Sequence, residues 1–170
     1  MNSLLEEAIE GWDGARQGVI AEASAIPARD WDFRPAPGAR SVAELVAHVV
    51  ATGMMWTNEL TRPTADFTRK SFPAFIRHYA KGVEKPRPRA EWLRLLRSSH
   101  RDGARQLRAA GEVQMLQYVR RFDGERGTRL TWLHHGIAHE EYHRAQLALY
   151  ARLLGRTPAL TRAIEGADAG

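Results

Sequence analysis

The sequence predicts an all-α protein built on a four-helix bundle. Four long segments carry apolar residues at three- and four-residue spacing, and each is bounded by capping or helix-breaking residues. Of the 170 residues, 44% are hydrophobic and 26% charged, which is typical of a folded globular chain of one domain. We therefore expect a single bundle domain over residues 1–163 and a small, polar, disordered tail over residues 164–170.

The first helix is expected from Ser3 to about Ser24. Ser3 is a suitable N-cap, and Pro27 lies just beyond the expected end. One face of the segment is apolar, and it consists of Leu4, Leu5, Ala8, Ile9, Trp12, Ala15, Val19 and Ala23. This spacing predicts that one side of the helix faces the core.

A capping box opens the second helix. Ser41 is the N-cap and Glu44 follows three residues later, so that each side chain can bond the backbone N–H of the other. We expect the helix to continue to about Leu60, because Pro63 prevents it from running further. The proline-rich residues 26–40 before it indicate an ordered loop.

The third long helix is expected over Arg89–Ala110, with Gly111 ending it. Residues 64–88 before it form a long connection between helices two and three, in which Phe72–Lys81 favours a short helix. A connection of this length argues against a simple series of short helical hairpins and favours a bundle with one crossover.

The fourth helix, from about Thr128 to Leu154, has the clearest boundary signals. Gly155 supplies a C-terminal cap, and Pro158 prevents the helix from resuming. Residues 113–128 before it contain an Asp-Gly turn signal between alternating apolar residues, which predicts a small β-hairpin.

Composition excludes several kinds of site. Cysteine is absent, so any metal ion must be held by His, Asp or Glu. The net charge of +5 comes mainly from arginines spread along the chain rather than from a basic run, so we expect no specific nucleic-acid binding.

Glu6 and Glu7 stand where a signal peptide needs an apolar stretch, and no segment is long enough to cross a membrane. We therefore expect a cytoplasmic protein.

Seven histidines occur, and four of them fall within residues 134–143. Residues four apart share a helix face, so His139 and His143 can direct two imidazoles at one point, while His48 lies on the apolar side of the second helix. One divalent cation satisfies three buried imidazole nitrogens that otherwise each need a hydrogen-bond partner. Two alternatives stay open. His48 can be an ordinary core residue, and His135 with His139, which are also four residues apart, can be the pair that binds the metal instead of His139 with His143.

Residues near these histidines carry further expectations. The face of the fourth helix that holds His139 and His143 is expected to point into the core, because it also carries Trp132, Gln146, Tyr150 and Leu153. Tyr142 and Tyr150 are expected to be core aromatics. Glu59, Glu140 and Glu141 are candidate supporting or proton-transfer groups, although the last two are rotated away from the histidine face and are expected in solvent. The histidines expected to be surface or structural residues are His78, His100 and His134.

Two stretches carry a family resemblance. The first is FRPAPGARSVAELVAH over Phe33–His48, and the second is HEEYHRAQL over His139–Leu147, followed by Leu153–Gly155. They resemble the loop with the opening of the second helix, and the fourth-helix motif, of the DinB-like superfamily of damage-inducible and thiol-transferase proteins. The resemblance spans nearly the whole chain in element order. Ala145 departs from the glycine that the family often has, which alters packing beside the site but leaves the ligands in place.

The resemblance implies a bundle in which His48, His139 and His143 hold nickel or zinc. Characterised members of the family are mostly transferases or isomerases that depend on low-molecular-weight thiols such as mycothiol or bacillithiol, and many are homodimers. The amphipathic first helix and the aromatic loop Trp31–Phe33 also favour a homodimer.

Three neutral nitrogen ligands leave a coordination position open, as expected of a catalytic site. We therefore expect a metal-dependent enzyme acting on a small molecule, either a thiol-dependent S-transferase or a hydrolase, with catalytic residues beyond the metal ligands unidentified. The rival interpretations are a non-enzymatic stress-response metal-binding module and a basic protein associated with nucleic acid. An open pocket over the histidines supports the enzyme, and a sealed site supports the module.

Overall fold

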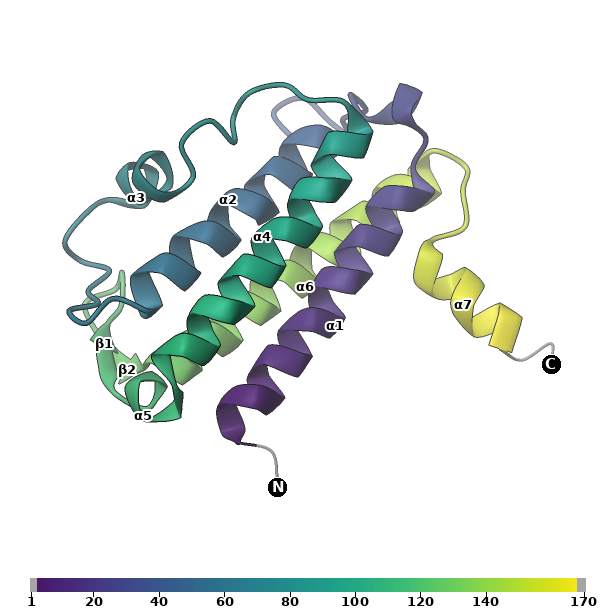
Figure 1. The fold of residues 1–170 in the computed structure, drawn as a ribbon. Helices are drawn as coiled ribbons and strands as arrows, with labels where there is room; N and C mark the ends of the chain where they lie inside the picture. Colours follow the sequence, from purple (N-terminus) through teal and green to yellow (C-terminus); the bar gives the residue numbers. More distant parts are fainter. Residues whose placement is uncertain (1–2, 168–170) are drawn as a thin grey trace.

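The computed structural model describes residues 3–167, and in it four long helices lie side by side as a bundle (Figure 1). They are α1 (Leu4–Ala25), α2 (Val42–Leu60), α4 (Arg89–Ala110) and α6 (Arg129–Leu153). Helices α1 and α2 each pack against both α4 and α6. The predicted all-α four-helix bundle is confirmed, and the helix bounds lie close to those expected from the sequence.

Smaller elements occupy the connections between the long helices. They are η1 (Ala28–Asp30), α3 (Phe72–Tyr79), α5 (Glu112–Met115), β1 (Tyr118–Arg120), β2 (Arg126–Thr128) and α7 (Ala159–Ala167). Strands β1 and β2 form the predicted antiparallel hairpin, and α3 lies within the segment expected to be helical. The N–H of Phe67 donates to the carbonyl oxygen of Arg120 at 2.9 Å, so the hairpin is bonded to the connection that follows α2.

Side-chain hydrogen bonds cap the start of three long helices, α1, α2 and α6. Ser41 and Glu44 form both bonds of the predicted capping box. Ser3 and Thr128 likewise accept a hydrogen bond from the N–H three residues further on. Gly111 ends α4 with φ at +79°, a backbone conformation that glycine adopts with little strain.

Helix α7 was not expected from the sequence. It runs through residues 164–167, which we expected to belong to a disordered tail, while residues 168–170 of that tail lie outside the described residues. The carboxylate of Glu22 on α1 accepts hydrogen bonds from the N–H of Ala159 at 2.8 Å and of Leu160 at 3.0 Å. A buried carboxylate on a distant helix therefore caps the start of α7.

Buried side chains fill the interior of the bundle along its length. In one half of the core Trp12 and Trp56 meet edge to face, with ring centroids 4.6 Å apart. Gly136 on α6 permits the close approach of α2, because a Cβ at this position would lie 2.8 Å from Cε2 of Trp56. Within residues 3–167, none of the helices combines the length and apolar character needed to cross a membrane.

Candidate metal centre

Three histidine side chains from two adjacent helices converge inside the bundle. His48 lies on α2, and His139 and His143 lie one turn apart on α6. Nε2 of His48 lies 3.1 Å from Nε2 of His139, which lies 3.0 Å from Nε2 of His143. The three residues, here called the histidine triad, therefore present their ring nitrogens to a common point, as the sequence predicted.

The ring nitrogens of the triad cannot all satisfy one another. A ring nitrogen carries either one proton or one lone pair, so Nε2 of His139 can complete a normal hydrogen bond to only one of its two neighbours. Nδ1 of His139 is also buried and has no hydrogen-bond partner among the described residues. Such a cluster of poorly satisfied nitrogens is the arrangement that a cation can stabilise.

The protonation states fit a ligand role. Burial lowers the pKa of His48 to about 3 and that of His139 to about 4, with further lowering from the positive charge of Arg40 and from the neighbouring imidazoles. Burial also lowers the pKa of His143, although its bond to Gln146 acts in the opposite direction. Near neutral pH all three rings are therefore uncharged and can offer lone pairs.

Gln146 defines the tautomer of His143. Its Oε1 lies 2.7 Å from Nδ1 of His143, and an amide oxygen only accepts hydrogen bonds. Nδ1 is therefore the protonated nitrogen, and Nε2 turns a lone pair towards His139. An outer hydrogen bond of this kind is the usual way in which a protein orients a histidine ligand.

The distances between nitrogens are compatible with one shared ion. Two histidine nitrogens bound to the same divalent metal at about 2.1 Å can lie at most about 4.2 Å apart. The spacings of 3.0 and 3.1 Å from His139 to its two neighbours meet this limit. The third pair, His48 and His143, is held only within 4.8 Å, so a small rotation of these two rings brings all three nitrogens onto one ion. The residues present therefore fit a divalent metal ion.

The other histidines do not join the triad. His135 is exposed and stacks on Trp132, with ring centroids 4.4 Å apart and planes inclined by 13°. His134 is exposed, and His100 is buried against Trp12. The structure thus favours the pair His139–His143 over the alternative pair that includes His135.

Several expectations about the neighbouring residues were wrong. Glu140 is fully buried, because Arg16 and Trp12 reach it from α1, whereas Glu141 is exposed as expected. Glu59 lies at the C-terminal end of α2, away from the triad, and its carboxylate accepts hydrogen bonds from Arg69 and Tyr79.

Among the residues expected in the core, Tyr150 is buried, as the sequence predicted. Tyr142 is 63% exposed and Leu153 is 56% exposed, because both lie on the same edge of α6, about a quarter turn around the helix axis from His143, where the helix faces solvent. The apolar face of this helix is therefore narrower than its sequence indicated.

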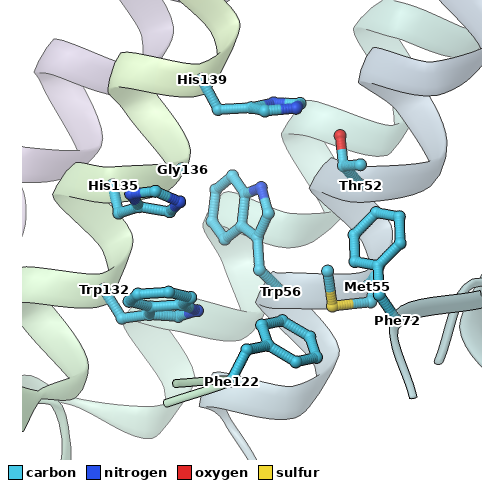
Figure 2. A pocket seen from close by; sticks show the side chains of 9 residues that line it. All are labelled: Thr52, Met55, Trp56, Phe72, Phe122, Trp132, His135, Gly136 and His139. Atoms are coloured by element: carbon cyan, nitrogen blue, oxygen red, sulfur yellow. The ribbon is translucent and has the colours of Figure 1, made fainter. Parts of the chain in front are cut away.

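Two partly open cavities border the histidine triad. The first, here called the aromatic cavity, has a volume of about 290 Å³, and its lining includes Trp56, Phe72, Phe122, Trp132, His135 and His139 (Figure 2). The second has a volume of about 550 Å³ and is lined in part by His48, Phe72 and Ile76. Small molecules can therefore reach the triad from outside the bundle. Sequence reasoning missed the aromatic cavity, since Phe72 and Phe122 come from connecting segments whose positions depend on tertiary contacts.

Solved structures with the same fold include DinB-like proteins. A DinB-like protein from Bacillus subtilis shares 17% identity at a TM-score of 0.68, with 89% of this chain and 93% of that chain covered. YfiT from Bacillus subtilis, described as a probable metal-dependent hydrolase with an unusual four-helix bundle topology, shares 18% identity at a TM-score of 0.65, covering 90% and 89%. A mycothiol-dependent maleylpyruvate isomerase shares 15% identity at a TM-score of 0.67, covering 86% and 63%.

No curated protein matches the chain in a sequence comparison. The sequence model of the DinB superfamily matches residues 12–147, a span that contains all three histidines of the triad. This match covers most of the chain and agrees with the resemblance carried by the two sequence motifs, so the protein belongs to the DinB superfamily.

Proposed function

We propose that this protein is a metal-dependent enzyme in which Nε2 of His48, His139 and His143 hold one zinc or nickel ion. The observation that carries the proposal is the convergence of three uncharged imidazoles at the border of two accessible cavities. Imidazole nitrogen is a ligand that both metals accept. The open surroundings favour a catalytic site over a sealed structural one.

The chemistry of such a site follows from its ligand set. When bound by three neutral ligands, a divalent ion lowers the pKa of a water molecule or a thiol in its remaining coordination position, so that a nucleophile forms near neutral pH. Gln146 keeps His143 in the required tautomer. The aromatic cavity offers a largely apolar surface beside the triad on which a substrate can be oriented.

The reaction we propose is thiol-dependent S-transfer or hydrolysis of a small molecule. Both are supported by proteins of the same fold, one described as a probable metal-dependent hydrolase and another as mycothiol-dependent. A low-molecular-weight thiol is the corresponding co-substrate for S-transfer.

A comparison of metal-stripped and metal-reloaded protein tests this proposal. Hydrolysis of 4-nitrophenyl acetate reports the first reaction, and conjugation of a small thiol with 1-chloro-2,4-dinitrobenzene reports the second. One of the two rates should rise when zinc or nickel is restored and should stay at background in His143→Ala. Stoichiometric metal with neither rate above background would instead support a non-enzymatic metal-binding module.

A further inference from the structure

The aromatic cavity has a lining suited to one kind of chemical group. Of the nine described residues that line it, none carries a carboxylate, an ammonium or a guanidinium group. A charged group buried among these side chains would lose its hydration without gaining an ion pair from any of them, which is unfavourable. The lining therefore selects an uncharged, largely apolar group.

The shape of the cavity favours a flat group. Trp132 and His135 present parallel rings from α6, while Phe72 and Phe122, 6.0 Å apart, come from α3 and the β-hairpin turn. Rings of this kind interact best with another aromatic system in stacked or edge-to-face contact. A cavity of about 150 Å³ holds one benzene molecule, so the 290 Å³ here suits a substituted ring.

One polar atom in this lining is without a partner. Nε1 of Trp56 is buried and has no hydrogen-bond partner among the described residues, and the side chain is only 4% exposed. Figure 2 shows the indole nitrogen on the side of the ring that faces His139 and Thr52. The ring is held in this orientation by Trp12 and by its close approach to Gly136. A buried N–H of this kind is costly unless a ligand accepts its hydrogen bond.

We propose that the aromatic cavity binds the substrate through a flat, uncharged aromatic group bearing a neutral oxygen acceptor, and that the indole N–H of Trp56 donates a hydrogen bond to that oxygen. The acceptor end of the group then lies towards His139 and the triad. Trp56 is thus a specificity-determining residue. The assignment of this ligand as substrate rests on the proposed function, whereas its binding to the cavity does not require a metal.

Nuclear magnetic resonance of the indole N–H signals tests the proposal directly. Acetophenone, ethylbenzene, benzoate and phenyltrimethylammonium are titrated into metal-free and zinc-loaded protein. Acetophenone should shift the Trp56 signal and bind about three- to tenfold more tightly than ethylbenzene, the usual effect of one neutral hydrogen bond. In the metal-free protein, where no metal ion can bind a carboxylate, tighter binding of benzoate or of the ammonium probe than of acetophenone would overturn the assignment to an uncharged group.

Two matched variants isolate the indole N–H. Trp56→Phe should reduce acetophenone binding to the level of ethylbenzene. Trp92→Phe removes another buried indole N–H that has no partner among the described residues, but Trp92 does not line the cavity, so binding should be unchanged. Equal affinities for acetophenone in wild type and in folded Trp56→Phe would refute the role of Trp56.

A third variant covers the case in which Trp56→Phe does not fold. Phe122 lines the cavity and is 37% exposed, so Phe122→Ala should fold and should weaken the binding of acetophenone and ethylbenzene alike. Unchanged binding of both probes in this variant would place the binding site elsewhere.

Acetophenone binding in a protein that takes up no metal would contradict the proposed function alone, and stoichiometric metal without acetophenone binding would contradict the cavity assignment alone.

Discussion

Glu140 is a buried carboxylate directly beside His139 on the helix that carries two of the three histidines. It accepts hydrogen bonds from Nε1 of Trp12 at 2.7 Å and from Nε and Nη2 of Arg16 at 2.7 and 2.6 Å. Arg16 also donates to the carbonyl oxygen of Leu96. This network joins α6 to α1 and α4, and it restricts the rotation of α6 that sets the direction of His139.

Glu140→Gln should destabilise the fold strongly, because it leaves the charge of Arg16 buried without its counter-ion. Removing one partner of a buried ion pair costs about 3–5 kcal/mol. Urea denaturation followed by circular dichroism measures the change in the free energy of unfolding. Glu141→Gln, at the exposed neighbouring position, is the control and should change it by less than about 0.5 kcal/mol. Similar small effects in both variants would show that the buried pair contributes little.

The residues of the site differ in how far sequence could identify them. Helical spacing alone paired His139 with either His135 or His143 and left His48 open, and it was the family resemblance that selected His48, His139 and His143 together. Burial of Glu140 was not predictable, since it depends on Arg16, 124 residues away in the chain. The spacing of residues on one helix predicts which of them share a face, but it does not predict which residues of other helices contact the opposite face.

At the scale of elements, Glu59 holds the end of α2 to the connection that follows it. Its carboxylate accepts hydrogen bonds from the N–H of Asp66 and from the side chains of Arg69 and Tyr79. Burial by itself raises the pKa of Glu59, but these hydrogen bonds outweigh burial and hold the pKa below its ordinary value. The ionised form of Glu59 therefore stabilises the folded state.

Glu59→Gln should alter how stability depends on pH. A carboxyl group whose pKa is lower in the folded state stabilises the fold above its unfolded pKa of about 4.3, and this contribution is lost as the pH falls through the folded value. We expect the variant to be less stable than wild type by about 1.5–3 kcal/mol at pH 7, with the difference shrinking below pH 4.3. Denaturant titrations from pH 7 to pH 3 measure this, with the exposed Glu10→Gln as control. A difference that stays constant over this range would contradict the assignment.

The sequence predicted the four long helices but not α7. The long helices have caps, breakers and apolar periodicity within their own segments, so local information was sufficient. The start of α7 is instead stabilised by Glu22 from α1, and α7 packs against that helix. A helix that is stabilised mainly by residues distant in the chain has few capping or periodicity signals in its own sequence, so it is hard to predict from that sequence.

At the scale of the whole molecule, homodimer formation stays a prediction. The features that suggested it from the sequence are largely buried within one chain, since α1 packs in the bundle and Trp31 is only 5% exposed. Apolar side chains are exposed instead on α6, where Leu149 is 51% and Leu153 is 56% exposed. Light scattering at micromolar concentration should give about twice the chain mass of 19.1 kDa, and a mass of one chain would contradict the prediction.

Metal content is the most direct test of the histidine triad. Elemental analysis of tag-free protein, before and after reloading, should find about one equivalent of zinc, nickel or another first-row divalent ion per chain. His48→Ala, His139→Ala and His143→Ala should each lose the metal. His135→Ala should retain it, with affinity changed by at most about tenfold to a hundredfold. Negligible metal in reloaded wild type, or an empty His135→Ala beside a loaded His143→Ala, would contradict the assignment of the site.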